Sequence, residues 1–319
     1  TKDKLAKEKK IDNLRIIPVY KENKVKGFFK LWASVKKTAR SIEGQYIITA
    51  QDPFYFGLIA SLVSRKYKVP FEIQVHTDIF EFTKRKIVLK TLARLTIPKA
   101  NGIRVVSNSA LNQIKKVVKN ISAKTYIIPI SIEKKDYSKA HYTTSNPTIL
   151  IVSRLEKEKN IFLALEIFKK TREHVPQLEL RIAGEGSLDH ELRKYAVSLN
   201  VEANTVFLGF VEDLEREYGK AQVLLHTADF EGFGMVFIEA AQAGLPIVST
   251  DIGIAKLISK FTFHKEDIDS AVTHLRNLLG GEDLWNKTSD ANNKNSEKFI
   301  TTKDNYVKSI VGAWSSLLE

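Results

Sequence analysis

The sequence predicts an α/β protein made of two doubly wound domains in tandem. Short runs of β-branched and other apolar residues alternate with amphipathic stretches, and this alternation is interrupted once, near residue 145, before it restarts. Apolar strands with helices between them are typical of parallel sheets covered on both faces. A chain of 319 residues also exceeds the usual size of a single core, so length alone favours two domains.

The first domain is expected to span residues 1–145. Helical patterns, for instance at 56–67 and 110–119, separate its predicted strands. These strands are the runs 14–19, 45–50, 71–76, 102–108 and 125–130. The first run is similar to the second strand of a typical domain of this kind. We therefore expect a first strand and a glycine-rich turn to be absent from the N-terminal part.

A polar segment with a proline, at 138–149, predicts the linker between the domains. The second domain, expected at 146–319, ends in an amphipathic helix at about 301–319 that is long enough to cross back onto the first domain. A loop is expected to be missing within 251–267, near 253–261. Before that helix, strands are predicted at 148–154, 178–184, 205–210, 221–227 and 246–251, and helices at 160–174, 188–198 and 236–244.

Composition excludes several classes of protein. The absence of cysteine rules out disulfides and thiolate metal sites, and it fits a reducing cytoplasm. The seven histidines show no paired metal-ligand spacing, so no metal is expected. No apolar run reaches the length of about eighteen residues that a membrane-spanning helix needs. The net charge of +13 fits either a polyanionic partner or a lysine-rich solvated surface, and composition leaves both open.

The strand ends of the second domain carry a candidate ligand site, because ligands of such sheets bind at the carboxyl ends of the strands, here between the domains. Arg154 and Lys159 flank the turn after its first strand. Two cations beside a helix N-terminus suit a diphosphate. Gly184 follows the second strand and permits close backbone approach. Phe210 and Val211 follow the third strand and suit a flat base.

The stretch DFEGFGMVFIEAAQAGLPIVSTD, at 229–251, places Glu231 on a loop and Glu239 on the helix that follows. Both could simply be surface residues of an amphipathic helix. A carboxylate, however, matches the two hydroxyl groups of a vicinal diol. Glu239 is therefore predicted to bind a ribose and Glu231 a second sugar. The glycines of EGFG would let the backbone approach the same ligand at Phe233, Gly234 and Met235.

These blocks resemble the donor-binding half of glycosyltransferase family 4, the retaining enzymes of the GT-B fold. The similar segments are SRLEKEKN, AGEGS, FLGFV and EGFGMVFIEAAQAGLPIV, including two glutamates with seven residues between them. In the first domain, QDPFYFG (51–57), QVHTD (74–78) and VVSNSA (105–110) occupy places where the family has similar segments. The resemblance covers nearly the whole chain, and it implies two Rossmann-like domains that face a central cleft.

The resemblance implies a metal-independent hexosyltransferase of the EC 2.4 class, with no cofactor other than its nucleotide-sugar substrate. It would move a sugar, with a UDP-sugar favoured as donor, to a hydroxyl group of a saccharide or lipid-linked acceptor, in the synthesis of a cell-surface glycan or glycolipid. Arg154 and Lys159 would hold the diphosphate, Glu239 the ribose and Glu231 the transferred sugar. His76 would point into the cleft from the acceptor-side first domain, unless it is only a satisfied histidine at a strand end.

The stretch 24–42 predicts a basic amphipathic helix. Lys30, Lys36, Lys37 and Arg40 surround its apolar face, and the segment 83–95 adds further positive charge. Such a helix fits the surface of an anionic membrane, which would make the protein peripheral on the inner face of the cell membrane. In the alternative, the apolar face packs inside the domain. That face consists of Phe28, Leu31, Trp32, Val35 and Ala39.

Two other classes of function stay open at this point. A sugar-nucleotide epimerase can share the GT-B fold, but the chain shows no paired catalytic carboxylate and histidine pattern that demands one. A basic nucleic-acid-binding protein would explain the positive charge. No recognised nucleic-acid-binding module occurs in the sequence, so nucleic acid is not the expected partner.

Overall fold

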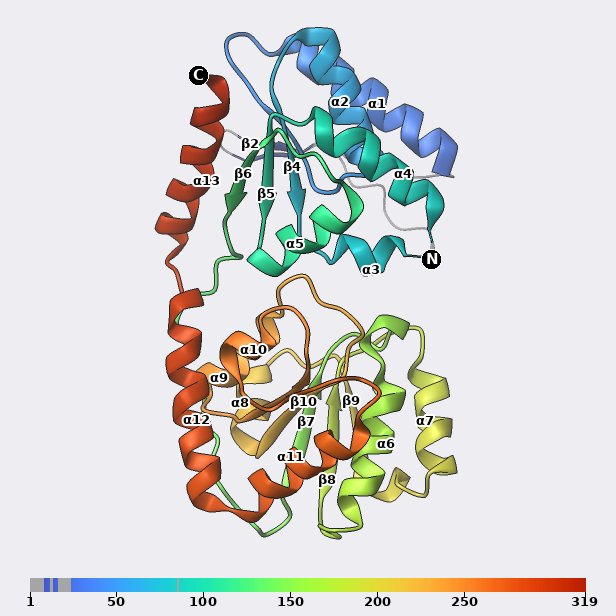
Figure 1. Ribbon diagram of the computed structural model, residues 1–319, viewed down its shortest axis with the longest axis vertical. Coiled ribbons are helices and arrows are strands. Elements are labelled where there is room, and N and C mark those ends of the chain that lie inside the picture. The colour runs from blue at the N-terminus through green and yellow to red at the C-terminus, as the bar shows by residue number, and fades with distance from the viewer. Residues whose placement is uncertain (1–8, 12–13, 17–23, 85) are drawn as a thin grey trace.

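The computed structural model describes residues 9–11, 14–16, 24–84 and 86–319. Two parallel sheets, each flanked by helices, lie one beyond the other along the long axis of the molecule (Figure 1). This arrangement confirms the predicted α/β fold with two domains. No helix among the described residues combines the length and the apolar character that crossing a bilayer requires.

The first domain holds a four-stranded parallel sheet. Its elements are α1 Lys24–Ser41, β3 Ile48–Ala50, α2 Tyr55–Tyr67, β4 Phe71–Val75, α3 Ile79–Thr83, α4 Ile87–Thr96, β5 Gly102–Val105, α5 Asn108–Val117 and β6 Lys124–Ile127. The strand order is β3-β4-β5-β6. All five residues of β4 are buried, as expected for a central strand covered on both faces.

The predicted strand at 14–19 does not join this sheet in its described part. Strand β2, Leu14–Ile16, pairs antiparallel with β1, Lys9–Ile11, in a separate two-stranded sheet. The prediction of a parallel strand is therefore wrong here, because the nearby segment Lys9–Ile11 supplies an antiparallel partner. Residues 17–19 and the position of the expected missing strand and turn lie outside the described residues.

The apolar face of α1 packs inside the first domain. It meets α2 at the buried residues Ile59 and Val63, so this face is not available to a membrane. The alternative interpretation, internal packing, is the one that the structure shows. The residues of α1 that take part are Phe28, Leu31, Trp32, Val35 and Ala39.

The second domain holds a six-stranded parallel sheet in the order β12-β11-β10-β7-β8-β9. Its strands are β7 Thr148–Val152, β8 Glu179–Ala183, β9 Thr205–Gly209, β10 Val223–His226, β11 Ile247–Thr250 and β12 Thr262–Phe263. Its helices are α6 Ile161–Arg172, α7 Asp189–Ser198, α8 Leu214–Lys220, α9 Met235–Gln242, α10 Ala255–Ile258, α11 Ile268–Gly280 and α12 Glu282–Ser296.

Several of these elements were not predicted from the sequence. Helix α12 is polar over most of its length and buries only a few residues, among them Trp285 and Asn292. Helices α3, α8 and α10 and strand β12 are too short to produce a clear period. Helix α11 is amphipathic, and the spacing of its buried residues Ala271, Leu275 and Leu278 is a sequence signal for a helix.

The last helix, α13 Lys303–Leu318, returns to the first domain and lies beside β6 (Figure 1). The hydroxyl of Tyr126 hydrogen-bonds the side chain of Ser316, and the indole of Trp314 donates to Glu72 at 3.1 Å. Ile310 and Ala313 pack against Ile128. The chain thus crosses between the domains twice, once after β6 and once before α13.

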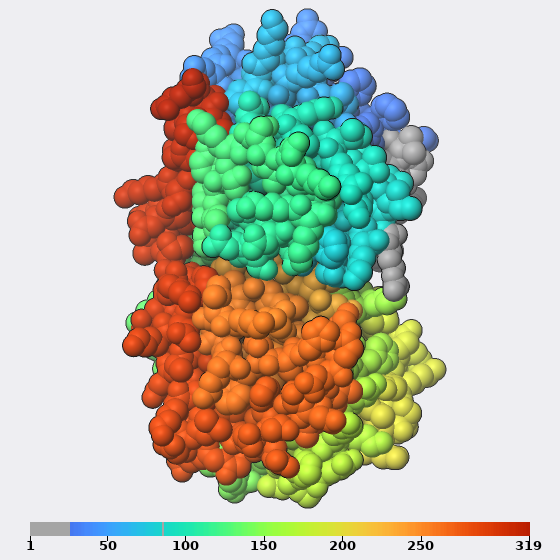
Figure 2. All heavy atoms as spheres, in the orientation of Figure 1, coloured from blue at the N-terminus to red at the C-terminus, as the bar shows by residue number. Residues whose placement is uncertain are grey.

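The domains are in direct contact at their facing ends (Figure 2). The loop at Gly232 approaches His76 so closely that a Cβ added at residue 232 would lie 1.8 Å from the His76 carbonyl oxygen. The hydroxyl of Ser107 also donates to the Gly232 carbonyl at 3.3 Å. Residue 232 must be glycine for this separation, because any side chain would push the loop away.

We expect Ala313→Glu to loosen α13 from the first domain. Ala313 is 5% exposed, so the change buries an unpaired carboxylate and lowers the free energy of unfolding by about 2 kcal/mol. Urea unfolding measures this loss, and limited proteolysis reports cleavage before α13. The control is Val311→Glu, on the same helix but 49% exposed, for which a change within about 0.5 kcal/mol is expected. Equal behaviour of the two variants would contradict the packing described.

Candidate active site

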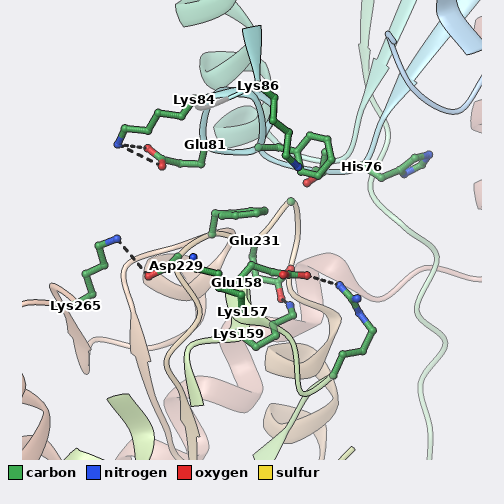
Figure 3. A pocket seen from close by; sticks show the side chains of 15 residues that line it. His76, Glu81, Lys84, Lys86, Lys157, Glu158, Lys159, Asp229, Glu231 and Lys265 are labelled. Atoms are coloured by element: carbon green, nitrogen blue, oxygen red, sulfur yellow. Dashed lines mark hydrogen bonds and ion pairs between the residues drawn. The ribbon is translucent and has the colours of Figure 1, made fainter. Parts of the chain in front are cut away.

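A cavity of about 620 Å³ lies where the two domains meet (Figure 3). It is placed at the carboxyl ends of β4, β7 and β10, where parallel α/β sheets bind their ligands. The first domain lines it with His76, Thr77, Glu81, Phe82, Lys84 and Lys86. The second domain lines it with Arg154, Lys157, Glu158, Lys159, Asp229, Phe230, Glu231, Gly232 and Lys265.

An ion pair between Lys159 and Glu231 lies on the second-domain side of this cavity (Figure 3). Lys159 ends the short 3-10 turn Lys157–Lys159 that precedes α6, and Glu231 follows β10. Their side chains are 13% and 19% exposed. Charges this far from water require compensation, and each of these two side chains compensates the charge of the other.

The imidazole of His226 lies behind this pair, with its Nε2 3.5 Å from the Glu231 carboxylate. Burial raises the pKa of Glu231, but the contacts with His226 and with the Lys159 ammonium outweigh it and lower the pKa to about 2. Burial lowers the pKa of His226. At neutral pH the site therefore holds an ionised Glu231 and a neutral His226.

Arg154 connects the first cavity to a second one. Its guanidinium is 67% exposed and pairs with Glu158 at 2.7 Å. It lines the main cavity and also a neighbouring cavity of about 420 Å³. The other residues of the second cavity are Val152, Ser153, Ala183, Gly184, Glu185, Phe210, Val211 and Leu214. The structure thus brings together four residues predicted from the sequence, which follow the strands β7, β8 and β9. These residues are Arg154, Gly184, Phe210 and Val211.

The glycine in this second cavity is required by its surroundings. Gly184 has a φ of 143°, and an added Cβ would lie 1.8 Å from the carbonyl oxygen of Ser153. Phe210, on the other side, is 75% exposed. The cavity therefore pairs a bare backbone surface with an open aromatic ring, which suits a flat ligand.

Glu239 is not among the lining residues of either cavity. Its carboxylate accepts a hydrogen bond of 2.8 Å from the hydroxyl of Tyr218, a residue that is fully buried. Burial, and then the negative charge of Glu239, raise the pKa of Tyr218 well above its ordinary value, so Tyr218 stays a neutral donor. Tyr218 fixes the orientation of Glu239, and nothing in its sequence context indicates this role.

In the segment Phe233–Met235, where α9 begins, the first residue is packed into the protein. Phe233 is 3% exposed and packs edge-on against Phe299. Its carbonyl accepts from the Ile254 amide at 3.0 Å. Gly234 precedes α9, and Met235, its first residue, is 39% exposed. That the backbone of this segment contacts a ligand stays a prediction.

His76 lies on the first-domain side of the cavity, apart from the Lys159–Glu231 pair (Figure 3). Its Nε2 is 3.1 Å from the side-chain oxygen of Gln51. Burial, and then the nearby charge of Arg104, lower the pKa of His76. The imidazole is therefore neutral at physiological pH.

Several residues of the cavity were not selected from the sequence. Lys84 and Lys86 had been counted only as part of a basic run, yet they line the cleft, where Lys84 pairs with Glu81 at 3.3 Å. Asp229 accepts from Lys265 at 3.2 Å. Its position in the loop that follows β10 is a sequence signal for this role. The described residues contain no group of three or more His, Asp or Glu side chains placed to hold a metal ion.

Residues 133–298 match the family described as glycosyl transferases group 1. Poly(glycerol-phosphate) alpha-glucosyltransferase of Bacillus subtilis (strain 168) is 26% identical over 176 residues, which cover 53% of this chain and 26% of that protein. Alpha-monoglucosyldiacylglycerol synthase of Streptococcus pneumoniae is 22% identical over 238 residues, 66% of this chain and 54% of that protein. The chain thus spans about a quarter and about half of these relatives.

Among solved structures, a mutant of S. aureus TarM in complex with Fondaparinux, alpha-GlcNAc-glycerol and UDP superposes with a TM-score of 0.76. The match covers 92% of this chain and 59% of that chain at 18% sequence identity. At this level of identity the similarity establishes the fold. The fold is GT-B, with two Rossmann-like domains.

The Lys159–Glu231 pair predicts a specific loss of stability in acid. Because folding lowers the pKa of Glu231 from 4.5 to about 2, its ionised form stabilises the fold above pH 4.5, and this contribution disappears as the pH falls towards 2. We expect Glu231→Gln to lower the free energy of unfolding by about 3 kcal/mol at pH 7. The difference from the wild type should shrink as the pH falls from 4.5.

Urea unfolding at several pH values measures this difference. Glu158→Gln is the matched control, because Glu158 pairs with the exposed Arg154 and should contribute less than about 1 kcal/mol at any pH. A difference between wild type and Glu231→Gln that stays constant down to acid pH would contradict the assigned ionisation.

Proposed function

Because this chain belongs to the glycosyl transferases group 1 family, we propose that it moves a sugar from a nucleoside diphosphate sugar to a hydroxyl group of a saccharide or lipid-linked acceptor, with retention at the anomeric carbon. The observation that carries this proposal is the position of Arg154. Its side chain borders both a cavity suited to a flat base and a cavity with the charged Lys159–Glu231 pair.

The donor is proposed to lie across the two cavities. Its base occupies the smaller cavity between Gly184 and Phe210, next to Val211. Its diphosphate follows at Arg154 and at the turn that carries Lys159. Glu239, oriented by Tyr218, binds the ribose hydroxyls. The UDP named with the TarM structure supports a UDP-sugar as the donor.

The transferred sugar is proposed to lie in the larger cavity near Glu231. An ionised carboxylate only accepts hydrogen bonds, so Glu231 binds sugar hydroxyls and does not protonate the leaving group. Arg154 and Lys159 stabilise the charge that develops on the departing diphosphate. The bond from the anomeric carbon to the diphosphate breaks, the bond to the acceptor oxygen forms on the same face, and the acceptor proton passes to the diphosphate.

A lipid-linked acceptor at an anionic membrane is proposed from the surface of the first domain. Helices α1, α2 and α4 are neighbours and contain no Asp or Glu (Figure 1). Helix α4 begins at Ile87, directly after Lys86 of the cavity, and Ile87 and Val88 are 82% and 63% exposed. Other exposed apolar side chains on these helices are Phe29, Tyr55, Phe56, Leu62 and Leu95.

Helices α1, α2 and α4 all lack acidic residues and all expose apolar side chains. This combination favours a bilayer over a single protein partner. Exposed apolar side chains insert between headgroups, while lysines attract anionic lipids. An acceptor held in such a surface would reach the cleft past Lys86. The glucosylated diacylglycerol in the name of the pneumococcal relative, alpha-monoglucosyldiacylglycerol synthase, supports this class of acceptor.

We expect one nucleotide sugar to raise the melting temperature of the protein. A ligand at one hundred times its Kd stabilises the native state by about 2.7 kcal/mol. UDP- and GDP-sugars are compared by thermal shift with the wild type, with Arg154→Ala and Glu239→Ala, and with Lys170→Ala as a distant control. Stabilisation of the wild type and the control, but not of the two site variants, is the expected result. No stabilisation by any of these sugars would overturn the donor assignment.

Vesicle sedimentation tests the membrane surface. We expect binding to vesicles with anionic lipids to exceed binding to zwitterionic vesicles, and to fall with added salt. Ile87→Ser with Val88→Ser should weaken it about tenfold, because two inserting side chains are lost. The control pair Val197→Ser with Val206→Ser changes apolar side chains on the second domain that are 55% and 39% exposed. Equal losses in both pairs would contradict this surface.

A further inference from the structure

A row of polar side chains runs along one face of β4 to the cleft. Glu72, Gln74 and His76 alternate with apolar residues, so they project from the same face of the strand. Glu72 and Gln74 are 0% and 5% exposed, and the indole N–H of Trp314 on α13 donates to the Glu72 carboxylate. His76 lines the cavity at the end of this row.

Arg104 fixes the orientation of the amide in the middle of the row. A guanidinium has hydrogens to donate and no acceptor. Its Nη1 lies 3.0 Å from Oε1 of Gln74, so this oxygen must face Arg104. The Gln74 amide nitrogen then faces the other way and donates to the Glu72 carboxylate at 2.9 Å. A reversed amide would place its NH2 group against the Arg104 guanidinium and its oxygen against the Glu72 carboxylate, and neither contact would be a hydrogen bond.

The orientation of the Gln51 amide follows by the same argument. Its amide nitrogen donates to Oε1 of Gln74 at 3.2 Å, which leaves its own oxygen free. That oxygen lies 3.1 Å from Nε2 of His76. An amide oxygen only accepts, so Nε2 of His76 carries the hydrogen. In a neutral imidazole the other nitrogen, Nδ1, is then an acceptor.

Arg104 itself is held in place on all sides. It is 2% exposed, and its Nε and Nη2 both donate to the carbonyl of Ile128 at 3.2 Å. The ring of Tyr306, from α13, lies 5.3 Å from the guanidinium carbon. Because the buried Arg104 guanidinium cannot turn away, it fixes the donor and acceptor roles of the hydrogen bonds that lead from it to His76.

We propose that Arg104, Gln74 and Gln51 are positioning residues that hold the hydrogen of His76 on Nε2 and present its Nδ1 as a hydrogen-bond acceptor to a hydroxyl group of the sugar in the cleft. The identity of that hydroxyl-bearing ligand rests on the proposed function. The position of the hydrogen on His76 is a property of the free protein and is measured without any substrate.

NMR of the full chain labelled with ¹⁵N-histidine tests the position of the hydrogen, and His76→Gln assigns the signal. The expected result is a protonated Nε2 and an unprotonated Nδ1 in the wild type at neutral pH. Gln51→Leu removes the acceptor at an exposed position and should give a mixture of both tautomers. Gln45→Leu, at another exposed glutamine before β3, is the control and should leave the signal unchanged.

Gln51→Glu provides the conservative variant. Its carboxylate still accepts from Nε2, so the tautomer should be kept, while the added negative charge raises the pKa of His76. Protonated His76 has no acceptor nitrogen. In a transfer assay with the nucleotide sugar found by thermal shift, we therefore expect the acid limb of the rate profile to move to higher pH. Gln51→Leu should lower kcat/KM about tenfold at neutral pH.

Two results would overturn the proposal: a wild-type His76 with its hydrogen on Nδ1, or a Gln51→Leu spectrum identical to that of the wild type. If the spectra are as expected and no sugar is transferred, the proposed function fails, and with it the role of Nδ1 towards a sugar, while the position of the hydrogen on His76 stands. Transfer that is equally fast in Gln51→Leu and in the wild type would remove the role of Nδ1 alone.

Discussion

The contact between the loop at Gly232 and the carbonyl of His76 sets the separation of the two domains. A Cβ at residue 232 would lie 1.8 Å from that oxygen, so only glycine permits the observed approach. The cavity between the domains takes its lining from both sides of this contact. Helix α13 supports the same arrangement from the other side of the first domain, because it ties the end of the chain to β4 and β6. The site is therefore a product of domain contact more than of either domain alone.

Charge in the cleft is held in pairs that differ in their exposure. Lys159 and Glu231 are shielded from water, whereas Arg154 and Glu158 are open to it. A shielded pair keeps its geometry without a ligand, which is the condition for electrostatic stabilisation of a developing charge. An exposed pair exchanges partners at little cost, because its attraction is already screened. The first pair suits the reacting groups, and the second suits a ligand that arrives and leaves.

Much of the fold could be predicted from the sequence, because most elements with a clear period of their own appear where that period places them. Strand β10 and helix α9 are examples. Two interpretations failed for physical reasons. The pairing of β2 was decided by a close antiparallel neighbour, which no pattern within 14–19 reveals. The pattern of α1 alone left both a membrane surface and a protein interior open for its apolar face, and its packing on α2 decided for the interior.

The sequence by itself determined the order of elements and the residues at the strand ends, because strand and helix periods and turn residues are local properties. Arg154, Lys159 and Glu231 could be selected from it, and the structure brings them to one cavity. Only the tertiary structure decided which groups face them. Tyr218 lies behind Glu239, and His226 lies behind Glu231. Arg104 is three hydrogen bonds away from His76, through Gln74 and Gln51. Each of these groups is distant or unremarkable in the sequence. Hydrogen bonds between side chains depend on distances of a few ångströms between separate elements, and no local pattern encodes such distances.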